Sequence, residues 1–183
     1  MEIQDRVKEI KQSFRQMMDG QVAQSMRDKA DEIGKDYDLA IALWKENVRE
    51  CKILATMLMP PDEILPEVVD IWMEQTDTVE IAEQAAMNLY QHLPYAPAKA
   101  YQWIASDREL CQLCGFHVLS RLFMNGQEPN ERGINEFLDQ AHTAILSPSL
   151  VVRKAAINSL NHFASLGLVY QRLADSIFRL AVY

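Results

Sequence analysis

The feature that most constrains the fold is the recurrence of apolar residues every three or four positions in one segment after another. In the first segment, Ile3, Val7, Ile10 and Phe14 follow this spacing, with charged residues between them. Residues three and four positions apart share one face of an α-helix, so the spacing predicts amphipathic helices. The pattern recurs over residues 2–19, 21–33, 36–44, 48–59, 66–73, 79–91, 98–105, 107–123, 131–146, 149–165 and 168–182. No segment shows a convincing strand alternation, and we therefore expect an all-α protein of about ten or eleven helices.

Polar caps, glycines and prolines indicate where these helices begin and end. The chain has only 6 Gly and 7 Pro, which is sparse for an all-β fold with its frequent turns. The predicted N-caps are Asp36 or Asp38, Thr76 or Thr78, and Ser106, the last with Glu109 three residues on as a capping box. The predicted helix ends are Gly20, Gly34, Pro60-Pro61 and Gly126.

Small residues recur in the middle of the predicted helices. Ala55, Ala85, Cys114 and Ala155 are separated by 30, 29 and 41 positions, and Gly115 follows Cys114. Small side chains let helices approach closely, and intervals of this size are typical of stacked HEAT or armadillo-like repeats. Small residues also occur where helices cross in other bundles. We expect a HEAT/armadillo-like α-α superhelix that forms a single helical-repeat domain over residues 1–183.

The charge of the chain is unevenly distributed. The formal net charge is −8, which argues against nucleic-acid binding because a DNA-binding protein neutralises phosphates with Lys and Arg. Residues 51–100 contain 2 basic and 8 acidic residues, whereas residues 151–183 have a net charge of +3. The mildly basic C-terminal end could therefore still contact a phosphate backbone.

Three cysteines bear on the compartment and on metal binding. Cys51, Cys111 and Cys114 are odd in number and no secretory signal is evident, so a reducing, cytoplasmic location is expected. No apolar run approaches the length of a membrane helix. Cys111, Cys114 and His117 could suggest a metal or redox site. Because all three fall in one predicted helix with no second ligand pair, we expect buried cysteines, no metal and no cofactor.

Glu80 and Glu83 are the candidate catalytic residues in the acidic centre of the chain. They are three positions apart and so share one helix face. A carboxylate there could act as a general base or stabilise a cationic sugar. The alternative is a solvated helix N-terminus, where the helix dipole favours acids. Trp44, Trp72 and Trp103 fall on apolar stripes and are predicted to lie in the core.

A resemblance to a known family rests on several segments. The strongest are Leu39 to Trp44, Arg49 to Met57, Pro61, Trp72 and Asp77 to Gln84; weaker ones are Trp103 to Leu110, Cys114 to Phe116 and Val152 to Ile157. Together they resemble the AlkD-type DNA alkylation repair family, a HEAT-like repeat fold. The resemblance implies removal of positively charged alkylpurines from duplex DNA, from a concave helical groove and without the base flipping usual for glycosylases.

The resemblance also assigns roles to individual positions, several of which are altered here. Glu83 stands where the family has the aspartate beside the lesion sugar. The DNA-binding positions are Val79 in place of an aromatic residue, Leu113 in place of an arginine, Asn158 in place of a tryptophan, and Arg153 and Lys154 as phosphate contacts. Two alternatives follow: a glycosylase of weak or lost activity, or a non-catalytic HEAT-like module that binds DNA or a protein partner.

Overall fold

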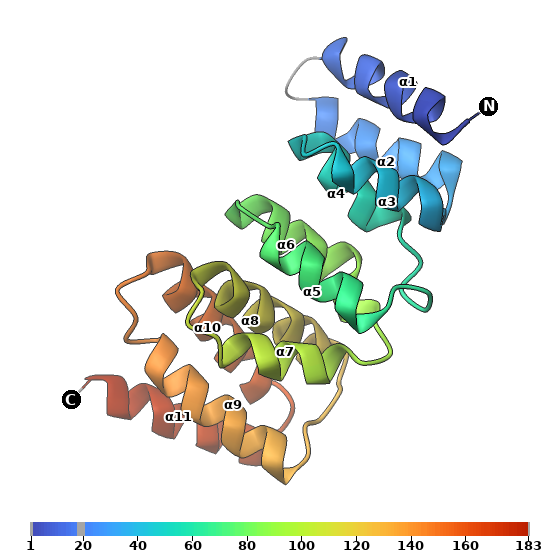
Figure 1. Ribbon diagram of the computed structural model, residues 1–183. Helices are drawn as coiled ribbons and strands as arrows, with labels where there is room; N and C mark the ends of the chain where they lie inside the picture. Colours follow the sequence, from blue (N-terminus) through green and yellow to red (C-terminus); the bar gives the residue numbers. More distant parts are fainter. Residues whose placement is uncertain (1, 18–20, 183) are drawn as a thin grey trace. The chain divides into compact units, whose positions relative to one another are not determined.

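The computed structural model describes residues 2–17 and 21–182, and within them all regular structure is helical, with eleven α-helices and no strand (Figure 1). The elements are α1 (Ile3–Arg15), α2 (Val22–Ile33), α3 (Tyr37–Lys45), α4 (Arg49–Leu58), α5 (Pro66–Glu74), α6 (Val79–Asn88), the 3₁₀ turn η2 (Tyr90–His92), α7 (Ala96–Ile104), α8 (Glu109–Met124), α9 (Glu131–Ala144), α10 (Leu150–Ala164) and α11 (Leu168–Val182). The all-α prediction is confirmed.

The chain divides into two compact units, Met1–Gln75 and Thr76–Tyr183. In the N-terminal unit, α1 packs against α3, α2 packs against α4, and α3 and α4 pack together. Helices α1 and α3 thus form one layer, and α2 and α4 form a second layer beside it (Figure 1). The single domain over residues 1–183 stays a prediction.

Two tryptophans join α5 to the other helices of the N-terminal unit. The rings of Trp44 and Trp72 are stacked, with centroids 4.4 Å apart, and both side chains are buried as the sequence predicts. Trp44 Nε1 donates to Gln75 Oε1 at 2.8 Å. The buried Lys52 ammonium lies 4.9 Å from the centroid of the Trp44 ring and donates to the carbonyl oxygen of Gln75 at 2.7 Å. A cation at a helix C-terminus satisfies a carbonyl that lacks a partner within the helix, so Lys52 holds the end of α5 in place.

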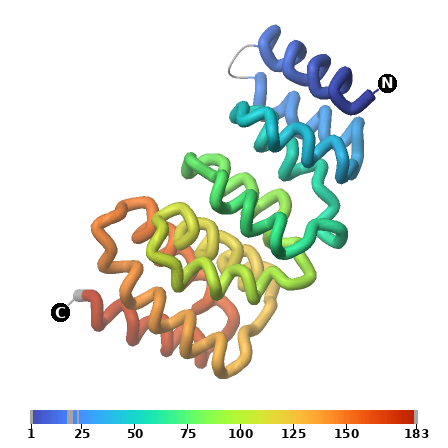
Figure 2. The backbone as a smooth tube through the Cα atoms, viewed as in Figure 1, coloured from blue at the N-terminus to red at the C-terminus, as the bar shows by residue number. Residues whose placement is uncertain are grey.

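Helix α8 is the centre of the C-terminal unit. It lies between α6 and α10 in one layer and packs against α7 in the other, where α7, α9 and α11 follow one another (Figure 2). Most of its residues are buried because it has neighbours on three sides. Four buried phenylalanines on α8, α9 and α10 form the core of this unit: Phe116, Phe123, Phe137 and Phe163.

Gly115 lies where α8 crosses α7. A Cβ at this position would stand 2.8 Å from the backbone nitrogen of Ile104 and 2.9 Å from the carbonyl oxygen of Ala100. Only a residue without a side chain allows the two backbones to come so close. The prediction that small residues mark close helix crossings is confirmed at this position.

The predicted caps are confirmed in part. Asp36 and Thr78 are the N-caps of α3 and α6, and their side chains accept hydrogen bonds from the amides of Leu39 and Ile81. The capping box at Ser106 is wrong, because α8 begins at Glu109 with Arg108 as N-cap. The Ser106 hydroxyl oxygen instead accepts from the Arg108 amide at 3.1 Å, and the carboxylate of Glu109 accepts from Ser149 Oγ at 2.8 Å.

Other boundaries differ by a few residues. Helix α7 begins at Ala96 rather than residue 98, and α9 ends at Ala144 rather than residue 146. Gly34 and Gly126 follow α2 and α8 with positive φ, as predicted for glycines that end helices. The predicted helix end at Gly20 lies outside the described residues. In the described part of the chain, no helix is both long and apolar enough to span a membrane.

Candidate functional site

Helices α6, α8 and α10 are neighbours in one layer, and hydrogen bonds fix their register. On the α6 side of α8, Cys114 Sγ donates to the carbonyl oxygen of Ala82 at 3.7 Å. On the α10 side, Glu109 meets Ser149 near the start of both helices, and the middle of α8 meets Ser159. Because these contacts occur in the same order along both helices, α8 and α10 run in the same direction.

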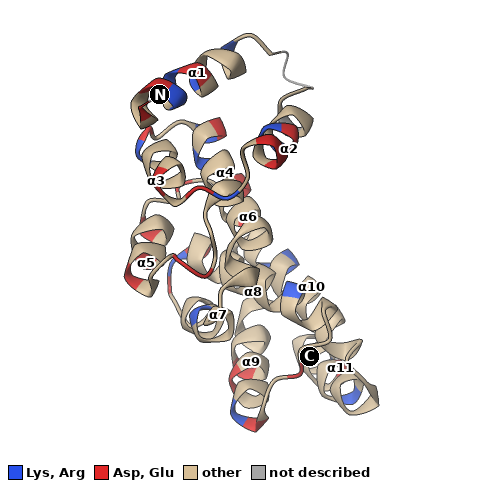
Figure 3. Cartoon of the chain, turned by 90° about the vertical axis from the view of Figure 1, so that its right-hand side faces the viewer, with Lys and Arg blue, Asp and Glu red and all other residues tan. Residues whose placement is uncertain are grey.

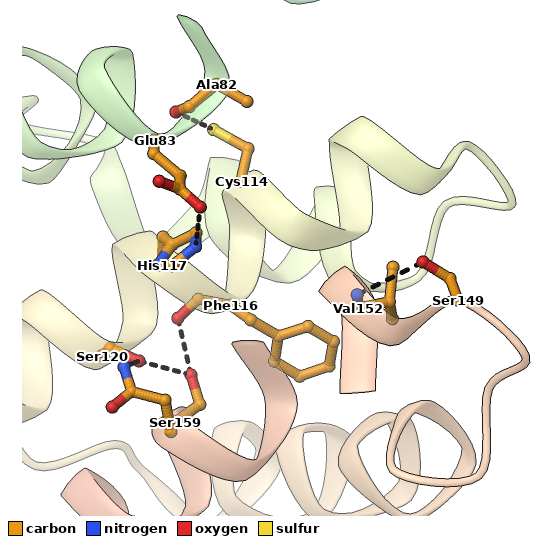
Figure 4. Close-up of polar contacts among 10 residues, drawn as sticks. Ala82, Glu83, Cys114, Phe116, His117, Ser120, Ser149, Val152 and Ser159 are labelled. Carbon is orange, nitrogen blue, oxygen red and sulfur yellow. Dashed lines mark hydrogen bonds and ion pairs between the residues drawn. The ribbon is translucent and has the colours of Figure 1, made fainter. Parts of the chain in front are cut away.

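Glu83 on α6 and His117 on α8 form a pair on this layer (Figure 4). Glu83 Oε1 lies 3.5 Å from His117 Nε2, and the two side chains are 49% and 27% exposed. Burial lowers the pKa of His117 below its ordinary value, and the charge of Arg121 lowers it further, while the Glu83 carboxylate opposes both effects. The imidazole is therefore neutral at pH 7 and can donate one N–H to the carboxylate.

A chain of hydroxyl hydrogen bonds joins α8 to α10. Ser159 Oγ donates to the carbonyl oxygen of Phe116 at 2.6 Å and lies 2.7 Å from Ser120 Oγ (Figure 4). Each hydroxyl has one proton, so Ser120 must donate to Ser159. Asn158 Nδ2 then donates to Ser120 Oγ at 3.4 Å. Because Ser120 Oγ accepts this hydrogen bond, the orientation of the Asn158 amide is determined. Its Nδ2 faces the interface between α8 and α10, and its Oδ1 is available to a ligand.

Two cations flank these polar residues. Arg121 follows His117 by one turn on α8, and the exposed Lys154 precedes Asn158 by one turn on α10. Figure 3 shows basic residues on α10, whereas acidic residues are frequent on the helices of the N-terminal unit. We call Glu83, His117, Arg121, Lys154 and Asn158 the α6–α8–α10 face.

Comparisons with known proteins identify the family. A family model described as "DNA alkylation repair enzyme" matches residues 11–165. The chain belongs to this family. A solved structure, described as "A new family of proteins related to the HEAT-like repeat DNA glycosylases with affinity for branched DNA structures", matches with a TM-score of 0.77 and 21% identity over 86% of this chain and 68% of that chain. This likeness confirms the predicted HEAT-like repeat fold. The comparison with curated proteins finds no match.

The residues that the family resemblance singled out lie in different surroundings. Val79 is half-buried at the start of α6, and Glu80 beside it is exposed. Leu113 is 1% exposed and belongs to the core of the C-terminal unit, so its side chain takes no part in the α6–α8–α10 face. The Arg153 guanidinium donates to the carbonyl oxygen of Ser147 at 3.1 Å, which ties it to the loop before α10. Of the positions that the resemblance predicts to contact DNA, Lys154 and Asn158 are the two on this face, and Asn158 is one of the altered ones.

Sequence reasoning missed His117 and Arg121 as members of this face. The sequence pattern places His117 beside Cys111 and Cys114 in one predicted helix, but both cysteines are buried. Among the described residues, no cluster of three or more His, Cys, Asp or Glu is placed to hold a metal ion. The signal that could have found His117 is its separation of 34 positions from Glu83, which is about one helical repeat.

Proposed function

We propose that this protein binds DNA, with a preference for branched structures, through the α6–α8–α10 face. The observation that carries the proposal is the presence of Arg121 and Lys154 on the same face as His117 and Asn158, on the adjacent helices α8 and α10. Arg and Lys supply the phosphate contacts that dominate DNA affinity, and neutral polar side chains add hydrogen bonds.

The distribution of charge supports this choice of surface. Residues 1–75 contain 10 basic and 16 acidic residues, a net charge of −6, whereas residues 76–183 contain 8 basic and 10 acidic residues, a net charge of −2. A phosphate backbone is therefore repelled less by the C-terminal unit than by the N-terminal unit. The preference for branched DNA is taken from the solved relative, whose description gives it affinity for branched DNA structures.

The test compares two double variants that remove the same charge from the same unit. The first, Arg121→Ala with Lys154→Ala, removes both cations of the face. The second, Arg172→Ala with Arg179→Ala, removes two exposed cations of α11 and serves as the control. Binding to a four-way junction, a duplex and a single strand is measured by fluorescence anisotropy at about 50 mM and about 200 mM salt.

We expect the wild-type protein to bind the junction more tightly than the duplex. The face variant should lose roughly tenfold or more in affinity. The slope of its log affinity against log salt concentration should become less steep by about 2, because each phosphate contact contributes about 1 to that slope. The α11 variant should remain close to wild type. Equal losses in the two variants would place the binding surface elsewhere, and no binding to any DNA at low salt would favour a protein partner instead.

A second candidate function is excision of alkylated purines with Glu83 as the carboxylate. It is favoured by the contact between Glu83 and a neutral His117, because an imidazole N–H that donates to the carboxylate holds it in one orientation, in which it could support a cationic sugar or a water attack. The half-buried Val79 and the buried Leu113 provide neither an aromatic nor a cationic contact to DNA. The deciding assay measures base release from duplex DNA containing N3- or N7-methylated purines. Release by wild type but not by Glu83→Gln would support excision, and equal release would contradict it.

A further inference from the structure

We propose that Glu83, held in place by its contact with His117, accepts hydrogen bonds from an unpaired base in the DNA, and that guanine is the preferred base. The proposal rests on the proposed function and states what the middle of the α6–α8–α10 face contacts. It divides the face into a central row that touches a base and two flanking cations that touch the backbone.

The central row consists of Glu83, His117 and Asn158, one from each of the three helices. Glu83 contacts His117 directly, and Asn158 reaches Ser120, which lies one turn beyond His117 on α8. None of the three is a cation at pH 7, since burial keeps the imidazole neutral. A phosphate group would meet a carboxylate and two neutral groups there, which is unfavourable.

The cations lie on opposite sides of this row. Lys154 is four residues before Asn158 on α10, and Arg121 is four residues after His117 on α8. Four residues of α-helix span about 6 Å along the axis. Because α8 and α10 run in the same direction, Lys154 lies toward the N-terminal side of the row and Arg121 toward its C-terminal side. A strand held by both cations would therefore pass over the central row.

The central row offers mainly hydrogen-bond acceptors to such a strand. Glu83 Oε1 faces His117, and its second carboxylate oxygen points away from the ring (Figure 4). Ionised carboxylates only accept hydrogen bonds, and in DNA complexes they accept from base amino groups such as cytosine N4. Asn158 adds a second acceptor, Oδ1, because its Nδ2 donates to Ser120.

An acceptor-rich row favours a donor-rich base edge. Guanine presents N1–H and its exocyclic amino group side by side, which matches the two oxygens of a carboxylate, whereas thymine presents a single N–H. In paired DNA the Watson–Crick edge is occupied, but an unpaired base exposes it, and proteins read unstacked bases at that edge. The acceptor-rich row thus gives a physical reason for preferring branched DNA over a continuous duplex.

The experiment uses three forked DNAs that differ at one unpaired nucleotide next to the branch. The arms are thymidine, and the test position is deoxyguanosine, deoxyinosine or thymidine. Inosine lacks the amino group but keeps N1–H. Each fork is titrated with wild type, Glu83→Gln and Glu80→Gln, and dissociation constants are measured by fluorescence anisotropy. Glu80→Gln is the matched control, because it removes the same charge from the same helix one turn earlier.

We expect wild type to bind the guanosine fork at least about fivefold more tightly than either the thymidine fork or the inosine fork, because those two bases present one N–H each and a good bidentate contact discriminates by about that much or more. Glu83→Gln should bind all three forks equally, since an amide cannot accept two hydrogen bonds side by side. Glu80→Gln should keep the wild-type order.

Three other results would contradict the base recognition by Glu83, the proposed DNA binding, or both. Equal binding of the three forks by wild type overturns base reading but leaves DNA binding in place. An unchanged preference for guanosine in Glu83→Gln assigns the reading to another residue and also overturns the proposal. Failure of every fork to bind overturns both the base reading and the proposed function. Circular dichroism of each variant confirms that it is folded.

Discussion

Substituting Gly115 with alanine perturbs the closest approach in the C-terminal unit. The new Cβ would meet the backbone nitrogen of Ile104 at 2.8 Å, its Cγ2 at 2.8 Å and the carbonyl oxygen of Ala100 at 2.9 Å. Backbone atoms cannot rotate away as the end of a side chain can. Helix α7 must therefore move away from α8 by several tenths of an ångström, along an interface that is central to the unit.

Two opposing effects determine the magnitude. Overpacking a well-packed core costs about 1–3 kcal/mol. Replacing a helical glycine with alanine contributes about 0.5–1 kcal/mol of stability, because alanine has less backbone freedom in the unfolded chain. Since the clash at Gly115 involves two backbone atoms of α7, the steric cost should exceed the gain. The expected net loss in the free energy of unfolding is about 1–2 kcal/mol.

The assay is urea unfolding followed by circular dichroism, with Gly133→Ala as the matched control. At Gly133 a new Cβ would meet side-chain atoms only, the hydroxyl oxygen and Cζ of Tyr101 at 2.8 and 3.2 Å and Cβ of Pro129 at 3.2 Å, so no backbone atom of another helix has to move. The control should therefore stay within about 0.5 kcal/mol of wild type. A Gly115→Ala variant as stable as the control, or more stable than wild type, would refute the close approach of α7 and α8.

Two further predictions concern the polar contacts of α8. Burial lowers the pKa of His117, so below about pH 6.5 the unfolded chain binds more protons than the folded chain, and the free energy of unfolding should fall as the pH falls from about 6.5 to the lowered pKa. His117→Asn should remove that part of the pH dependence in urea unfolding, and an unchanged slope would assign it to other groups. Ser159→Ala removes the oxygen that accepts a hydrogen bond from Ser120. It should lower the free energy of unfolding by about 1–3 kcal/mol, measured by thermal unfolding. Exposed Ser176→Ala, the control, should be near neutral, and equal stability of the two variants would contradict the buried role of Ser159.

Some of the helix boundaries follow from local chemistry. Asp36 and Thr78 cap their helices because a short polar side chain can accept from an amide three residues on, whatever lies elsewhere in the fold. At Ser106 the same local signal gave the wrong start for α8. The hydroxyl oxygen accepts from the Arg108 amide two residues on, and the carboxylate of Glu109 faces Ser149, 40 positions away.

The sequence by itself determined the helical class, most helix positions and the buried tryptophans, because the spacing of apolar residues encodes which side of a helix faces a core. Only the tertiary structure decided the composition of the candidate site. Helix α8 is apolar on most sides, so its periodicity cannot indicate that Leu113 faces the core while His117 and Arg121 border the surface. The pairing of Glu83 with His117 depends on the register between α6 and α8, which is set by how whole helices pack rather than by any local signal.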